Sequence, residues 1–129
     1  MNRLLALTAL IEAATGLALL VVPAVVVRLL LGAEISGAAI PLGRVAGAAL
    51  LALGVACWLA GDDTKSRAGK GLVVAMSVYN AGAVIVLGAA GIQLPTVGIA
   101  LWPAVILHAV MAVWCVRVLC VEKTGSDAA

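Results

Sequence analysis

The chain of 129 residues is 65% hydrophobic and 11% charged, and its mean hydropathy is +1.25. Eight basic and six acidic side chains are too few to cover a core of this length with polar surface, so the composition excludes an ordinary soluble domain and indicates a lipid bilayer. The formal net charge of +2 and the three Trp, one Tyr and no Phe argue against a nucleic-acid partner.

The first apolar run covers residues 4–22, which at a helical rise of about 1.5 Å per residue is long enough to cross the hydrocarbon core of a bilayer. It carries Glu12 midway and leads to Pro23 rather than to a small-residue cleavage site, so we expect a mature helix and not a signal peptide. Pro23 suits the first turn of a new helix. Residues 24–31 therefore predict a short interfacial helix, which Gly32 ends.

Three further apolar runs follow, at about residues 40–60, 72–90 and 97–119. A charged loop over 61–70 separates the second run from the third, and a tight turn containing Pro95 separates the third from the fourth. The sequence therefore predicts an all-α protein in which residues 1–129 form a single transmembrane domain. We expect an integral membrane four-helix bundle with a short interfacial helix after the first span.

The basic residues beside the spans are distributed unevenly. Arg28 falls on one side, and on the other side fall Arg3, Lys65, Arg67, Lys70, Arg117 and Lys123. Because Lys and Arg are enriched in cytoplasmic loops, the N-terminus, the 61–70 loop and the C-terminus are expected in the cytoplasm. The predicted location is the bacterial cytoplasmic (inner) membrane.

Small residues recur at helical spacing within the spans. Ala9, Ala13 and Gly16 form one such stripe in the first span, and Gly43 and Gly47 form another in the second. Helices in lipid associate through close packing at small residues and through polar groups that find partners. The second stripe suits either packing inside one chain or packing in a homo-oligomer, and the sequence leaves this choice open.

Each of the four spans contributes at least one polar group. Glu12 in the first, Tyr79 and Asn80 in the third and His108 in the fourth lie near mid-bilayer depth, and Arg44 in the second lies closer to the outer boundary. A charge at mid-bilayer costs about 2.5–3.5 kcal/mol on insertion scales, so these groups should face protein. We expect either an intramembrane ion pair between Glu12 and Arg44, or an unpaired Glu12 that can carry a proton.

Simpler structural interpretations stand beside these. Tyr79 and Asn80 suit an interhelical hydrogen bond, and His108 follows Ala100 and Ala104 at four-residue spacing, which places it on a packed seam. One histidine cannot make a closed metal site by itself, so no metal is expected. No activated nucleophile is recognisable, so a catalytic role ranks below the others.

The layout resembles that of small bacterial DoxX-like membrane proteins. The similarity rests on the Glu-bearing first span, the segment from Pro23 to Gly32, and Gly43 and Arg44 at the start of a Gly-rich second span. It implies a compact four-helix membrane bundle associated in some cases with quinone-linked redox complexes, and points to Glu12 and Arg44.

Two hypotheses for function follow. The first is a non-catalytic membrane protein that binds a hydrophobic ligand, a quinone or a lipid, around Glu12, Arg44, Tyr79, Asn80 and His108, or that serves as a subunit of a membrane complex. The second is a proton-coupled transporter that uses Glu12, as small multidrug exporters use a glutamate in their first helix. Arg44 would repel a cationic substrate, which weighs against the second hypothesis.

Overall fold

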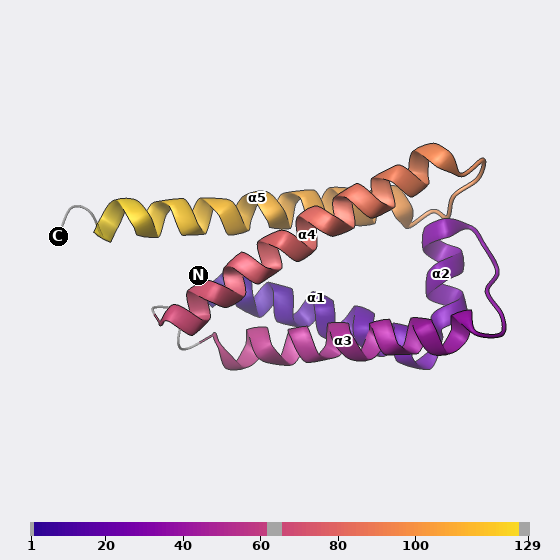
Figure 1. The fold of residues 1–129 in the computed structure, drawn as a ribbon, viewed down its shortest axis with the longest axis horizontal. Coiled ribbons are helices and arrows are strands. Elements are labelled where there is room, and N and C mark those ends of the chain that lie inside the picture. The colour runs from indigo at the N-terminus through magenta and orange to yellow at the C-terminus, as the bar shows by residue number, and fades with distance from the viewer. Residues whose placement is uncertain (1, 62–65, 127–129) are drawn as a thin grey trace.

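The structure, a computed structural model, describes residues 2–61 and 66–126, and over these residues the chain forms five helices and no strand (Figure 1). The helices are α1 (Asn2–Val21), α2 (Pro23–Leu31), α3 (Ala39–Leu59), α4 (Arg67–Gln93) and α5 (Leu101–Ser126). Four of them, α1, α3, α4 and the part of α5 up to Val121, are long and apolar enough to cross a membrane. The predicted all-α class with four candidate spans is confirmed.

The ends of the helices follow from local chemistry. Pro23 occupies the first turn of α2, and Gly32 ends this helix in the left-handed conformation at φ 68°, with its N–H donating to the Arg28 carbonyl over 2.9 Å. The side chain of Ser66 accepts a hydrogen bond from the Gly69 N–H at 3.0 Å and caps α4. Because of this cap, α4 begins several residues before the predicted third span.

The long helices pack in two pairs, α1 with α3 and α4 with α5. Figure 1 shows the beginnings of α1 and α4 and the last turn of α5 at one end of the molecule, and α2 lying crosswise at the other end. The chain therefore starts α1 and finishes α5 at the same end.

The α1–α3 interface is built from small residues, among them Gly16 and Gly47 of the two predicted stripes and also Gly54. A Cβ atom added to Gly16 would lie 2.6 Å from the Gly47 carbonyl oxygen, and one added to Gly54 would lie 2.8 Å from the Ala13 nitrogen. These are backbone atoms, so the two helices touch where glycine removes the side chain. Both stripes thus serve packing within one chain.

A buried apolar cluster joins the two pairs near the end opposite α2. It consists of Leu4, Leu5, Ala9, Cys57, Val73, Met76, Met111 and Cys115. Cys57 and Cys115 are buried free thiols and fill this core as small hydrophobic side chains. Because α1, α3, α4 and α5 all contribute, the cluster fixes the two pairs against each other at this end.

The connection before α5 is not helical where the sequence predicted the fourth span to begin. Residues 97–100 precede the helix and bond to the C-terminal turn of α2: the Gly98 N–H donates to the Leu30 carbonyl at 3.0 Å and the Ala100 N–H donates to the Leu29 carbonyl at 2.9 Å. A Cβ atom on Gly98 would overlap the Leu29 carbonyl. The two hydrogen bonds and this close approach attach the end of α2, which also contacts the α1–α3 pair, to the residues just before α5 of the α4–α5 pair.

Candidate functional site

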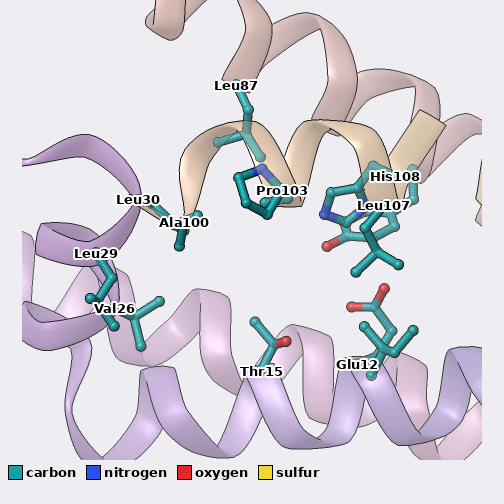
Figure 2. A pocket seen from close by; sticks show the side chains of 13 residues that line it. Glu12, Thr15, Val26, Leu29, Leu30, Leu87, Ala100, Pro103, Leu107 and His108 are labelled. Atoms are coloured by element: carbon teal, nitrogen blue, oxygen red, sulfur yellow. The ribbon is translucent and has the colours of Figure 1, made fainter. Parts of the chain in front are cut away.

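A cavity of about 360 Å³ lies between the two helix pairs on the side of α2. It is lined by residues of α1, α2, α4, α5 and the turn before α5: Ile11, Glu12, Thr15, Val26, Leu29, Leu30, Tyr79, Leu87, Ala100, Pro103, Ala104, Leu107 and His108. The volume falls within the range of about 300–1,000 Å³ that is typical of small-molecule sites. Figure 2 shows Glu12 and His108 facing each other at one end and Val26, Leu29 and Leu30 at the other.

Glu12 is the acidic group of the cavity. Glu12 is only 3% exposed, and the Tyr79 hydroxyl donates a hydrogen bond toward the Glu12 carboxyl group. Glu12 comes from the middle of α1 and Tyr79 from α4, so this contact bridges the two helix pairs.

His108 is held from behind by Asn80. Its Nδ1 lies 2.8 Å from Asn80 Oδ1, and the Asn80 side-chain nitrogen donates to the Met76 carbonyl at 2.8 Å. Its ring also meets the Tyr79 ring edge to face, with centroids 5.6 Å apart and planes at 81°. The interhelical hydrogen bond predicted for Tyr79 and Asn80 is therefore present for Asn80, and it joins α4 to α5 through His108.

Of the two arrangements expected for Glu12, the ion pair with Arg44 is not formed. Arg44 is exposed, and among the described residues the salt bridge is the one between Arg28 and Glu34. In the antiparallel α1–α3 pair, Glu12 lies about level with Gly54. Arg44 is about ten residues away along α3, which is about 15 Å at the helical rise and beyond the reach of a side chain.

Replacing Arg44 by Gln should therefore leave folding stability within about 0.5 kcal/mol of the wild type, as for other exposed positions without a specific contact. Thermal unfolding in detergent measures this, with Arg28→Gln as a control for loss of an exposed pair whose side chains are 71% and 75% accessible. A loss of about 3–5 kcal/mol for Arg44→Gln would instead indicate a buried ion pair and contradict the geometry.

The five predicted site residues thus separate into three groups. Glu12, Tyr79 and His108 lie on the cavity wall; Asn80 lies behind His108; and Arg44 lies elsewhere on the molecule. The contribution of α2 and of the start of α5, which supply much of the apolar wall, was not predicted from the sequence. The signal that could have located it is Gly98, because a glycine in a turn beside a helix end permits close backbone approach.

No protein-family model matches the chain, nor does any curated protein or solved structure. In the part of the chain that the structure describes, no group of three His, Cys, Asp or Glu side chains could hold a metal ion. The arrangement offers instead a mainly apolar cavity in which Glu12, Tyr79 and His108 are gathered at one end.

Proposed function

We propose that this chain is a multi-pass membrane protein that binds a small hydrophobic ligand with a polar head group, of the quinone or lipid type. The observation that carries the proposal is the polarity of the cavity. Glu12 and His108 lie at one end, and the aliphatic side chains of Val26 and Leu29 lie at the other (Figure 2). Tyr79 also lines the cavity and contacts both Glu12 and His108. An amphipathic ligand matches this pattern, with its head among the polar groups and its tail along α2.

The burial of these groups supports a binding role. A carboxyl group within a membrane span is costly, and intramembrane ionisable residues commonly mark ligand or ion sites. Glu12 has no salt bridge to a basic residue in the described part of the chain, so an ion pair does not account for its presence. The resemblance of the sequence to DoxX-like membrane proteins favours a quinone as the ligand.

Filling the cavity tests the proposal. An Ala104→Phe variant should bind a short-chain benzoquinone or a monoacylglycerol at least about tenfold more weakly than the wild type, because the new ring occupies the space that the ligand needs. Calorimetric titration in detergent measures the affinity. Ala81→Phe is the matched control, since Ala81 is exposed on α4 and does not line the cavity. Failure of the wild type to bind either probe would refute the proposal.

A second candidate is a proton-coupled transporter, favoured by the same Glu12 carboxyl group on the cavity wall without a cationic partner among the described residues. The two functions differ in vesicles. Proton-driven uptake of a substrate that is lost in Glu12→Gln would favour transport, whereas binding without net uptake would favour the first function.

We further infer that the protein lies in a bacterial inner membrane with both termini in the cytoplasm. The support is the bias of six basic residues against one between the two ends of the spans. Assembly into a homo-oligomer or a membrane complex is compatible with this placement.

A further inference from the structure

His108 is the single histidine of the chain, and one of its ring nitrogens is already used inside the protein. The Asn80 side-chain nitrogen donates to the Met76 carbonyl, which fixes the other end of the amide, Oδ1, as the atom facing His108. An amide oxygen only accepts hydrogen bonds. The hydrogen in the contact between Asn80 and His108 therefore lies on Nδ1 of the imidazole.

In the neutral ring, the second nitrogen, Nε2, is then an acceptor. Nε2 has no hydrogen bond to any residue in the described part of the chain. Among the described side chains, the one nitrogen or oxygen atom that is both fully buried and without a partner is Thr8 Oγ1. Nε2 also has no partner, so it cannot be fully buried. Because His108 lines the cavity, Nε2 is accessible from the cavity side.

The Nδ1–H of His108 is thus used within the protein, and the Nε2 acceptor remains on the cavity side.

Given the ligand-binding function proposed above, we propose that the cavity selects ligands whose polar head carries a hydroxyl group, and that His108 Nε2 accepts the hydrogen bond from this hydroxyl. A hydroquinone and a lipid alcohol share this chemistry. A quinone carbonyl lacks this chemistry, because its oxygen only accepts hydrogen bonds. Facing Nε2, which is also an acceptor, it would leave Nε2 without a partner. Asn80 is the positioning residue, since it fixes the tautomer of His108 without lining the cavity.

The tautomer can be measured on the wild-type protein without any ligand. Nitrogen NMR of protein labelled with ¹⁵N-histidine reports one imidazole, because the chain has one histidine. At a pH where the ring is neutral, we expect the proton on Nδ1 and a bare Nε2. A proton on Nε2 with a bare Nδ1 would overturn the inference.

Selection for a hydroxyl is tested with two pairs of ligands under anaerobic conditions. One pair is a short-chain hydroquinone and its dimethyl ether, and the other is a long-chain alcohol and its methyl ether. The hydroxyl form should bind roughly 2- to 10-fold more tightly, as expected for one neutral hydrogen bond. The pair that shows the difference identifies the head group. Equal affinities within both pairs would overturn the inference, and tighter binding of the parent quinone than of the hydroquinone would do the same.

A His108→Phe variant assigns the preference to the imidazole. It keeps a flat ring against Tyr79 but has no Nε2, so the difference within the ligand pair should disappear while some binding remains. A preference that persists in this variant would place the acceptor on Glu12 or Tyr79 and reject His108. If the wild type binds none of the four ligands, the proposed function fails, whereas the NMR result still decides the tautomer by itself.

Discussion

A Gly16→Ala variant is expected to lose about 1–3 kcal/mol of folding stability, although the change adds a single methyl group. The new Cβ would lie 2.6 Å from both the Gly47 carbonyl oxygen and the Leu51 nitrogen. Both are backbone atoms of α3, so no side chain can rotate away and the whole helix must shift. Reversible unfolding in mixed detergent micelles measures the loss.

The matched control for this variant is Gly82→Ala. Gly82 lies within α4, and a Cβ added there would meet nothing within 4 Å. Since alanine favours a helix over glycine by up to about 1 kcal/mol, this variant should be neutral or more stable than the wild type. Equal losses in the two variants would show that the α1–α3 contact is not what makes Gly16 sensitive.

The sequence predicts the helices and the small-residue stripes well, because both depend on local or periodic features, whereas it leaves open which helices the stripes join. Long apolar runs define the spans. Pro23 and Gly32 mark the two ends of α2, because proline suits the first turn of a helix and glycine suits the left-handed conformation that ends one, whatever residues pack nearby. The stripe containing Gly16 and the stripe containing Gly47 have the spacing of small-residue interfaces, and the two stripes meet.

The position of Arg44 was harder to predict because it depends on the register between two helices. Counting from the start of each span suggested that Arg44 could reach Glu12, whereas the glycine contacts set Glu12 beside the later part of α3. Electrostatic reasoning favours a partner for a buried carboxyl group but does not say which one. Tyr79, an uncharged donor on a different helix pair, takes that place.

The cavity has no periodic signal in the sequence. Its wall is assembled from four helices and a turn, and it exists because the pairs are joined by the apolar cluster at one end and bridged by α2 at the other. Glu12, Tyr79 and His108 were predictable as polar residues at one depth. Their placement at one end of a mainly apolar cavity follows from the crosswise course of α2, which no local pattern indicates.

A Gly98→Ala variant should therefore affect both stability and ligand binding. The added Cβ would overlap the Leu29 carbonyl, so the turn must move away from the end of α2. The hydrogen bonds from the Gly98 N–H to Leu30 and from the Ala100 N–H to Leu29 would be lost with it. At about 0.5–1.5 kcal/mol for each bond and about 1–3 kcal/mol for the overlap, we expect a loss of about 2–6 kcal/mol.

The same variant tests whether α2 completes the cavity. Val26, Leu29 and Leu30 form the apolar end of the wall, so an α2 released from the turn should weaken binding of a short-chain benzoquinone or a monoacylglycerol and speed hydrogen exchange over residues 23–31. Gly88→Ala is the control, because a Cβ at Gly88 would meet nothing within 4 Å. Unchanged exchange in α2 with unchanged affinity would mean that the backbone bonds to Gly98 and Ala100 do not hold this helix. In that case other contacts would hold the apolar end of the cavity, and the proposed placement of the ligand tail along α2 would be wrong.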